Sequence, residues 1–429
     1  MKKNTLLYTF VSSLLCCYFC GDIIKAEVYQ SRADYNEVSF LFNYKKEMVK
    51  NNLREKNKNN NSFFYSVITN DYYCSSQTWV SDMIDLDDAW IYQGSNTIRI
   101  GIIDTGIDVT HPDLVGKINT ALSYSFIDDE PLIDYTGHGT SVAGIIGANK
   151  NNNIGIYGIN SNVELVSLKV SNSLTTSNPT ASANDIASAI NYAQANGIKL
   201  INASVGVNVS TTALQTAVSN YSGLIVCAAG NDHFYIDDPY YYIYPQCYSN
   251  DNLLVVGAND QDDAMTVFTN YGACNVDLFA PGKDIMSTVP ATINSSNYSL
   301  VSGTSYAAPI VTGVVSLLLS RYPCISATEL KADIMNSVDL LIGSMPYFSS
   351  CASHGRLNAR ESIKLALNHI HYQAINNYYH EQYCSHQSYG YFPHNWVLST
   401  IFPMSTYQPD YIPNYVCSDC GMISMGIPV

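Results

Sequence analysis

Five apolar runs occur along this chain together with three helix-like segments rich in small residues, and the alternation of the two kinds constrains the fold most. Short apolar runs bounded by turn residues are typical of buried strands. Strands that alternate with helices form parallel sheets with helices packed on either side. We therefore predict a three-layer α/β fold, in which helices cover both faces of a mostly parallel central sheet. The expected strands lie near 98–103, 164–170, 198–203, 224–229 and 253–258, and the expected helices near 138–148, 182–196 and 305–321.

A serine stands between a Gly-Thr pair and a run of small residues, in the sequence Gly-Thr-Ser-Tyr-Ala-Ala-Pro at 303–309. A strand-to-helix turn at this point exposes the serine hydroxyl, while Ala307 and Ala308 let the following helix pack closely. The first N–H groups of that helix point toward any negative charge that develops nearby. Ser305 is therefore a candidate nucleophile, although Gly-Thr-Ser runs also occur in ordinary loops.

An aspartate and a histidine occur in settings that complete a nucleophilic site. Asp104 follows the apolar run at 98–103, so we expect it at the carboxyl edge of the sheet. His138 begins a predicted helix that has small residues on its packing face. Either residue alone is more often structural than functional. Together with Ser305 they supply a nucleophile, a base for its proton and an acid that orients the base.

The three segments resemble the motifs of the subtilisin-family serine proteases, and the similarity runs from about Trp79 to about His369. The resemblance implies a subtilisin-like fold and a secreted serine endopeptidase that hydrolyses proteins or peptides through an acyl-enzyme intermediate. It assigns catalytic roles to Asp104, His138 and Ser305. The matching segments are 104–108, 138–144 and 303–309.

The same resemblance implies further residues around the reacting bond. In Ala-Ala-Gly-Asn at 228–231, the amide of Asn231 would bind the oxyanion, whereas a simple turn residue is the alternative. Residues 200–206 resemble an edge strand to which an extended peptide substrate adds by backbone pairing. The implied walls of the primary substrate pocket are Ser204, Val205 and Gly206 on one side and Ala228, Ala229 and Gly230 on the other.

Acidic residues near this pocket leave open whether it prefers basic or apolar substrate side chains. Asp232 directly follows the oxyanion asparagine, and Asp237 and Asp238 lie in an aromatic insertion at 234–244. These carboxylates would favour basic substrate side chains if they reached the pocket. As solvated loop acids, which are commoner, they would leave a broad apolar preference.

Two other classes of protein are alternatives to the protease. An α/β-hydrolase needs Gly-x-Ser-x-Gly, with its acid and histidine after the serine, but here Ala307 replaces the second glycine. The alternative function is a catalytically silent subtilisin-fold protein that binds or regulates through its C-terminal tail. The intact catalytic positions favour an active enzyme.

A structural calcium ion is also implied by the resemblance. The sequence His-Pro-Asp at 111–113 and the loop at 151–156 match segments that bind calcium through hard oxygen ligands. This loop is predicted to be one residue longer than usual, so the ligand register stays open, and a polar surface loop without metal is the alternative. The implied ligands are Asp113, Asn152, Ile154 and Ile156.

Four regions are predicted along the chain. Residues 1–26 have the lysines and short apolar run of a signal peptide, with a retained anchor as the alternative, and no later segment predicts a stable membrane span. Residues 27–72 form a short basic prosegment, which is a possible inhibitor of a zymogen. Residues 73–369 form the peptidase domain, and 370–429 a Tyr/His/Pro/Cys-rich extension of unknown role. The net charge of −15 argues against nucleic acid as a partner.

Cysteine and asparagine usage fits a secretory compartment. Of the 12 cysteines, three lie in the signal segment, and most of the others are expected to be paired, with Cys227 free. The Cys-x-x-Cys at 417–420 favours a disulfide over zinc. Permitted N-glycosylation triplets begin at Asn60, Asn208, Asn220, Asn294 and Asn297, and another at Asn202 lies in the predicted binding strand.

Overall fold

The computed structural model describes residues 69–127, 132–172, 180–341 and 350–366, together with short strands between 371 and 425. The predicted signal peptide and nearly all of the predicted prosegment lie outside these residues. In the described part, a nine-stranded sheet runs in the order β12-β13-β9-β8-β7-β6-β1-β3-β2, and only the β12–β13 pair is antiparallel. Its strands are β1 (Ile98–Asp104), β2 (Tyr124–Ser125), β3 (Val163–Lys169), β6 (Leu200–Ala203), β7 (Leu224–Ala228), β8 (Leu253–Asn259), β9 (Leu278–Pro281), β12 (Asp339–Leu340) and β13 (Gly355–Arg356).

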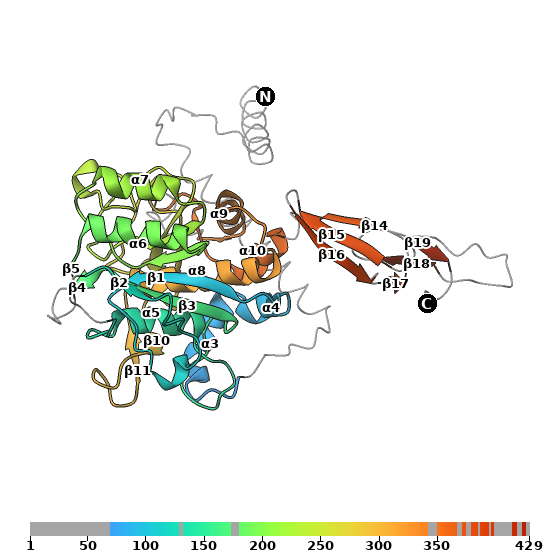
Figure 1. Cartoon of the computed structure of the whole chain (residues 1–429), viewed down its shortest axis with the longest axis horizontal. Coiled ribbons are helices and arrows are strands. Elements are labelled where there is room, and N and C mark those ends of the chain that lie inside the picture. Colours follow the sequence, from blue (N-terminus) through green and yellow to red (C-terminus); the bar gives the residue numbers. More distant parts are fainter. Residues whose placement is uncertain are drawn as a thin grey trace, which may run out of the picture. The chain divides into compact units, whose positions relative to one another are not determined.

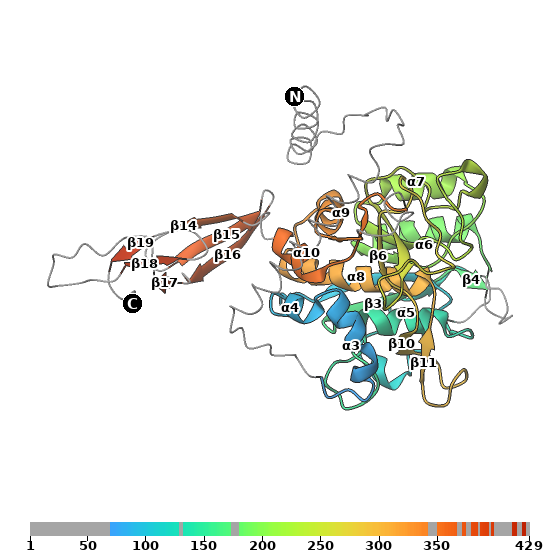
Figure 2. The ribbon, with the colours of Figure 1, turned by 180° about the vertical axis from the view of Figure 1, so that it is seen from behind.

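Helices cover both faces of this sheet, as predicted, and Figures 1 and 2 show the resulting layers. On one face, α5 (His138–Gly147) and α8 (Thr304–Arg321) share a core with Ile102 of β1. On the other face, α6 (Ala183–Ala195) and α7 (Thr212–Asn220) share a second core with Ile103. Successive side chains of a strand point to opposite faces, so uninterrupted apolar strands supply both cores.

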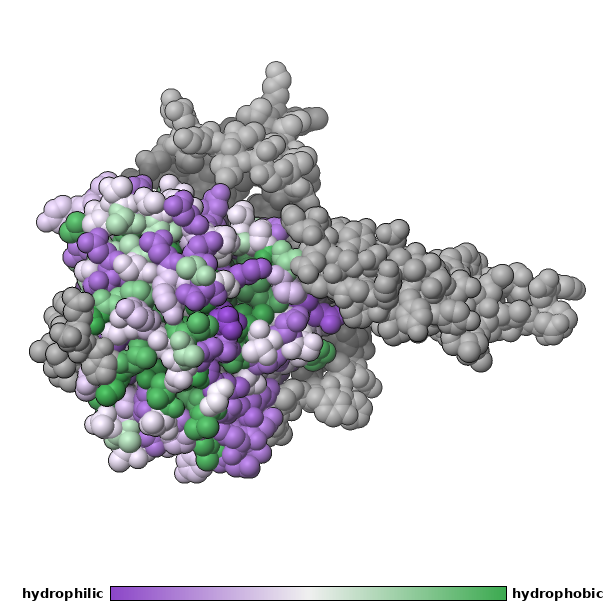
Figure 3. Space-filling view, viewed as in Figure 1, coloured by the Kyte–Doolittle hydropathy of each residue, from purple (hydrophilic) through white to green (hydrophobic). Residues whose placement is uncertain are grey.

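The predicted strands and helices are all present, and a capping box at Ser326 begins α9 (Ala327–Asn336). The sequence interpretation did not identify α7, β9 or the hairpin of β10 (Ile285–Thr288) and β11 (Tyr298–Val301). Figure 3 shows the face of Figure 1, where polar side chains surround scattered apolar patches. Within the described residues, none of the helices combines the length and apolarity that a bilayer crossing requires.

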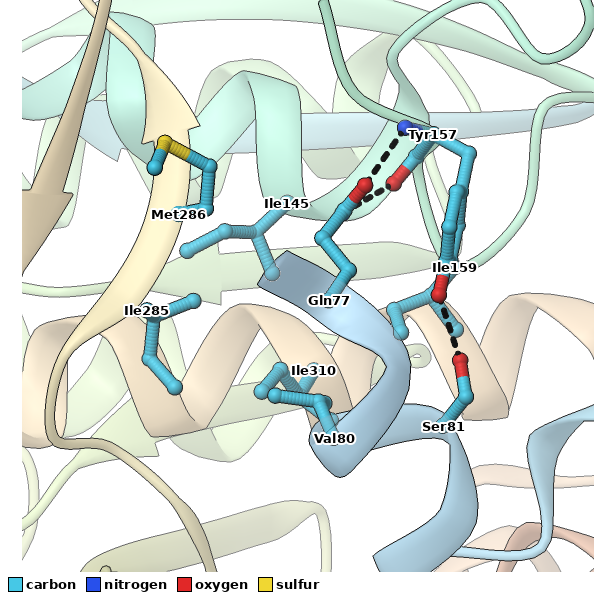
Figure 4. Close-up of a pocket in the computed structure, with 9 residues that line it drawn as sticks. All are labelled: Gln77, Val80, Ser81, Ile145, Tyr157, Ile159, Ile285, Met286 and Ile310. Atoms are coloured by element: carbon cyan, nitrogen blue, oxygen red, sulfur yellow. Dashed lines mark hydrogen bonds between the residues drawn. The ribbon is translucent and has the colours of Figure 1, made fainter. Parts of the chain in front are cut away.

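The segment before β1 is fastened to the domain by two short helices, α3 (Cys74–Met83) and α4 (Leu86–Trp90). Gln77 accepts the backbone N–H of Tyr157 at 3.0 Å and donates to its carbonyl at 2.8 Å, while the Tyr157 hydroxyl meets Ser81 Oγ at 2.7 Å (Figure 4). The cavity beneath α3 has a volume of about 20 Å³ and a mainly isoleucine lining, so it has room for about one water molecule and for no substrate.

The C-terminal extension contains strands, for which the sequence analysis made no prediction. One antiparallel sheet has the order β14-β15-β16, and another has the order β17-β18-β19. These strands are β14 (His371–Ala374), β15 (Tyr379–Cys384), β16 (Gln387–Pro393), β17 (Trp396–Leu398), β18 (Asn414–Cys417) and β19 (Ile423–Met425).

In the described domain, five cysteines are free, which contradicts the expectation that most are paired. Cys227 is free, as predicted, and burial raises the pKa of its thiol. Its side chain packs in the core between the sheet and α6 and α7, where a thiol behaves as a small apolar group. The expected pairing of most of the nine later cysteines is wrong, because the free ones are Cys74, Cys227, Cys247, Cys274 and Cys351.

Candidate active site

The three residues of the predicted triad come from the ends of three different elements. Asp104 is the last residue of β1, His138 the first of α5 and Ser305 the second of α8. In the sheet, β1 lies between β3 and β6, so the chain first extends to one side of β1 and then to the other. Ligands of open parallel sheets bind at such switch points, beyond the carboxyl ends of the strands.

Asp104 and His138 form a direct contact. His138 Nδ1 lies 2.7 Å from Asp104 Oδ1, which also accepts the backbone N–H of Thr105 at 2.7 Å. The carboxylate is 1% exposed. A Cβ on Gly139 would lie 2.1 Å from the Gly106 carbonyl oxygen and 3.1 Å from Asp104 Oδ1, so only glycine lets α5 approach this closely. Gly139 is therefore required for His138 to lie this close to Asp104.

Asp134 holds the histidine turn in place, and the sequence analysis did not identify it. Its buried carboxylate accepts the backbone N–H groups of Gly137 and Thr140, each at 2.9 Å. It also accepts the hydroxyls of Thr105 at 2.9 Å and Thr140 at 2.7 Å. Asp134 thus joins the end of β1 to the start of α5, and we interpret it as a positioning residue.

The charge of His138 is controlled by these two aspartates. Burial by itself would lower the pKa of the imidazole, but the charge and hydrogen bond of Asp104, and the more distant charge of Asp134, outweigh it and raise the pKa. The ring of Tyr306 lies 5.4 Å from the His138 ring, between centroids. This contact places the residue after Ser305 directly beside the imidazole.

Ser305 lies at a turn that only glycine allows. Gly303 has φ 151° and ψ 158°, a backbone region used almost exclusively by glycine, and it leads directly into α8. The Ser305 carbonyl accepts the Ser204 hydroxyl at 2.9 Å. In the described residues, no hydrogen bond joins His138 to the Ser305 hydroxyl, and such bonds often tighten only when substrate binds.

Asn231 is oriented by the start of α8. Its Oδ1 accepts the backbone N–H of Thr304 at 2.9 Å and the Thr304 hydroxyl at 3.1 Å. Because both donors engage the oxygen, the amide nitrogen must point away from Thr304. Gly230 N donates to Thr304 Oγ1 at 3.0 Å, which holds the preceding residue against the same helix start. Asn231 itself is exposed, so its amide N–H groups are available to a ligand.

The predicted substrate walls both bond to the start of α8, but one expectation about them is wrong. Residues 200–203 are not an edge strand, because β6 pairs with both β1 and β7. Only the continuation through Ser204, Val205 and Gly206 lies beyond the paired part of β6. Asn202 is 0% exposed and bonds Ser204 and Thr312, so the folded domain cannot carry a glycan there. The opposite wall begins at Ala228, the last residue of β7, and continues through Ala229 and Gly230.

The acids near the pocket have separate roles. Asp237 accepts the backbone N–H groups of Cys274 and Asn275 at 3.0 and 2.9 Å, so it fastens the aromatic insertion to a neighbouring loop. Asp238 caps the short helix Pro239–Tyr241 through the N–H of Tyr240. Asp232 is exposed, and its backbone N–H is bound by Asn270. Two of the three acids therefore serve the insertion itself.

The residues proposed to bind calcium do come together. Asp113 is fully buried, and its carboxylate accepts Asn152 Nδ2 and Ile156 N, each at 2.8 Å. Ile154 N donates to Asn152 Oδ1 at 3.0 Å. The sequence analysis missed Asp71, whose carboxylate accepts the N–H groups of residues 151 and 152 at 3.0 and 3.1 Å. Burial, with a smaller contribution from the Asp71 charge, raises the pKa of Asp113 to about 6.

Comparisons with known proteins agree with this architecture. The model of the subtilase family matches residues 95–372. A thermophilic serine proteinase of Bacillus sp. (strain AK1) is 35% identical over 68% of this chain and 69% of its own length. Thermitase of Thermoactinomyces vulgaris is 36% identical over 69% of this chain and 99% of its own. The chain therefore belongs to the subtilase family and is a subtilisin-like serine protease.

A solved structure supports the fold alone. A protease of Pseudoalteromonas arctica PAMC 21717 superposes with a TM-score of 0.59 at 23% identity, covering 70% of this chain and 99% of that one. The similarity at this level of identity concerns the three-layer architecture, and the roles of individual residues rest on the geometry described above.

Proposed function

We propose that this protein is a secreted serine endopeptidase in which Asp104, His138 and Ser305 form the catalytic triad. The observation that carries the proposal is the 2.7 Å contact between His138 Nδ1 and the buried Asp104 carboxylate, beside the glycine turn that presents Ser305. A carboxylate in this position keeps the proton on Nδ1, which leaves Nε2 free to act as a base.

Each residue then has one task in the reaction. Ser305 Oγ attacks the peptide carbonyl carbon while His138 Nε2 takes the hydroxyl proton. The oxyanion receives N–H groups from the Asn231 amide and from the start of α8. His138 next protonates the leaving amine as the C–N bond breaks, which leaves an acyl-enzyme on Ser305. Water repeats the sequence and releases the acid, and Asp104 stabilises the charged imidazole in both halves.

A fluorophosphonate probe separates this function from the silent binding protein. The probe labels only a serine that an assembled site has activated, so wild-type protein should be labelled and Ser305→Ala should not. Labelled protein in the culture medium, with an amino terminus beyond residue 26, would also support secretion. Absence of labelling in folded protein favours the silent alternative, and labelled protein confined to cells contradicts secretion.

Removing the proposed oxyanion donor should slow the chemical step. We expect Asn231→Ala to lower kcat by about 10²–10³-fold with little change in KM, the size of effect found for the corresponding asparagine of subtilisin. Steady-state kinetics with a peptide anilide measures both constants. Asn250→Ala, which removes a surface bond to Ser219, serves as the matched control and should leave both constants unchanged. Equal kcat for the two variants would show that Asn231 is only a turn residue.

A bound calcium ion is the second part of the proposal. Asp71 and Asp113 bring two carboxylates to one loop, and in the described residues neither forms an ion pair with a basic side chain. A hard divalent cation would relieve this like-charge contact. Calcium would then be held by Asp71, Asp113 and the carbonyls of Ile154 and Ile156. Asn152 would join them when its amide oxygen, which here accepts the N–H of Ile154, turns toward the ion.

Chelation should then destabilise the protein. An ion that binds only the native state stabilises it by about 2.7 kcal/mol when its concentration is 100 times Kd. We expect EDTA to lower the melting temperature of wild-type protein by several degrees and to have a much smaller effect on Asp113→Asn. Asp108→Asn is the control, because in the described residues the Asp108 carboxylate accepts hydrogen bonds only from Thr110 of its own turn. Identical melting curves with and without EDTA would show that the protein has no calcium site.

Contacts of residues 69–73 indicate where the proposed prosegment ends. Thr69 and Asp71 are 4% and 2% exposed, and the N–H of Tyr73 donates to the Gly155 carbonyl at 2.7 Å. Residues 69–72, which were assigned to the prosegment, thus pack on the loop at 151–155. We place the processing site of the zymogen before Thr69, so that Asp71 stays with the mature domain.

A further inference from the structure

Two backbone segments flank the proposed nucleophile, and they follow neighbouring parallel strands. The Ser204 hydroxyl donates to the Ser305 carbonyl, and Gly230 N donates to Thr304 Oγ1. In an acyl-enzyme on Ser305, the side chain on the acyl side of the cut bond would lie between these two segments. This step rests on the proposed function, because it takes Ser305 as the attacked residue.

Gln246, from the loop between β7 and β8, bridges these two segments. Its Nε2 donates to the carbonyl of Val205 at 3.0 Å and to that of Ala228 at 2.9 Å. Both partners are acceptors, so the amide nitrogen must face them and the amide oxygen must face away. That oxygen is buried and has no hydrogen-bond partner in the described residues. The residue as a whole is 3% exposed.

The Gln246 amide fills the space beside the glycine of one wall. A Cβ on Gly206 would lie 3.0 Å from Gln246 Nε2 and 3.1 Å from its Oε1. Beside the other wall, a Cβ on Gly230 would lie 2.3 Å from Asn270 Nδ2 and 3.2 Å from Cδ1 of Ile243, which belongs to the same loop as Gln246. Glycines leave room for a substrate side chain, but here protein side chains already occupy part of that room.

We propose that Gln246 plugs the deep end of the primary pocket, so that the enzyme cuts after glycine, alanine or serine and rejects large aromatic or aliphatic side chains. A large side chain would have to displace the Gln246 amide, break both hydrogen bonds and leave the part-buried Val205 carbonyl and the buried Ala228 carbonyl unpaired. A small side chain does not reach the plug. The amide oxygen is buried in the folded domain, so recognition of a polar side chain by this oxygen is not favoured.

Peptide anilides that differ only in the residue before the cut test this inference. With wild-type enzyme, kcat/KM should be at least about tenfold higher for alanine than for phenylalanine. In Gln246→Ala the pocket deepens, and the phenylalanine-to-alanine ratio should rise by about tenfold or more. Gln246→Leu keeps most of the side-chain volume but has no amide, so it should retain the preference for small residues.

Separate readouts distinguish this inference from the proposed function. Titration with a fluorophosphonate counts assembled active sites in each variant, and failure to label wild-type protein would contradict the triad rather than the plug. Gln194→Ala, which loses a hydrogen bond to Ser222 elsewhere, is the matched control and should keep the wild-type ratio. A wild-type preference for phenylalanine, an unchanged ratio in Gln246→Ala, or equal shifts in the alanine and leucine variants would overturn the proposal.

Discussion

Replacing Ser305 with alanine is expected to lower kcat by about 10⁶-fold, the effect known for the corresponding serine of subtilisin. The variant keeps the Gly303 turn and the α8 start but lacks the only hydroxyl that could form the acyl-enzyme at that turn. The remaining hydrolysis would come from oxyanion stabilisation and substrate binding alone. Active-site titration and kcat with a peptide anilide measure the loss.

The same variant tests self-processing. If the enzyme removes its own prosegment, Ser305→Ala should retain residues before Thr69, and sequencing of its amino terminus shows whether it does. Ser222→Ala, which loses a surface hydrogen bond to Gln194, is the matched control and should be processed and active. Near wild-type turnover by purified Ser305→Ala would disprove the triad assignment.

Local sequence was enough to predict five strands of the sheet and the positions of Asp104, His138 and Ser305 at the ends of their elements. Asp104 directly ends an apolar strand and His138 and Ser305 begin helices, so each one's position follows from its immediate neighbours. The helix α7 and the strand β9 were not identified, because they are short, with nine and four residues. The error about the edge strand has a different cause. Which strands lie next to each other in a sheet depends on the topology of the whole domain, and β6 lies between β1 and β7.

Residues that act through long-range contacts could not be predicted from local motifs. Asp134 matters because its carboxylate binds Thr105, which is 29 positions away. Gln246 bridges carbonyls that lie 41 and 18 positions earlier. Asp71 was placed in the prosegment, although it contacts a loop 80 positions further on. An aspartate or glutamine in a loop has no sequence signal for such a contact, so only the folded chain reveals these roles.

Changing Asp104 to asparagine should lower kcat/KM by about 10⁴-fold while leaving the fold intact. Asp104 Oδ1 accepts both His138 Nδ1 and the backbone N–H of Thr105. An asparagine that keeps its oxygen at the Oδ1 position retains both contacts but has no negative charge to stabilise the imidazolium. An asparagine that turns its NH₂ group to this position makes His138 accept at Nδ1, so the imidazole proton moves to Nε2, the nitrogen that has to receive the Ser305 proton.

The pH dependence distinguishes this mechanism from a general loss of structure. Asp104 is the main cause that raises the pKa of His138 against burial, so Asp104→Asn should lower that pKa. Because the base works when neutral, the acidic limb of kcat/KM should move to lower pH in the variant. A raised histidine pKa stabilises the fold below the unfolded value of about 6.5, and this stabilisation disappears as pH rises through the folded pKa.

The stability lost in Asp104→Asn should accordingly be larger at pH 5.5 than at pH 8.5, and thermal melts at the two pH values measure it. Asp251→Asn, at an exposed position, is the control and should show neither the kinetic loss nor the pH-dependent difference. If Asp104→Asn kept the wild-type acidic limb, Asp104 would not set the protonation of His138. A loss of stability that is equal at both pH values would mean that the carboxylate only packs against Thr105, and the 2.7 Å contact would then have no part in proton transfer.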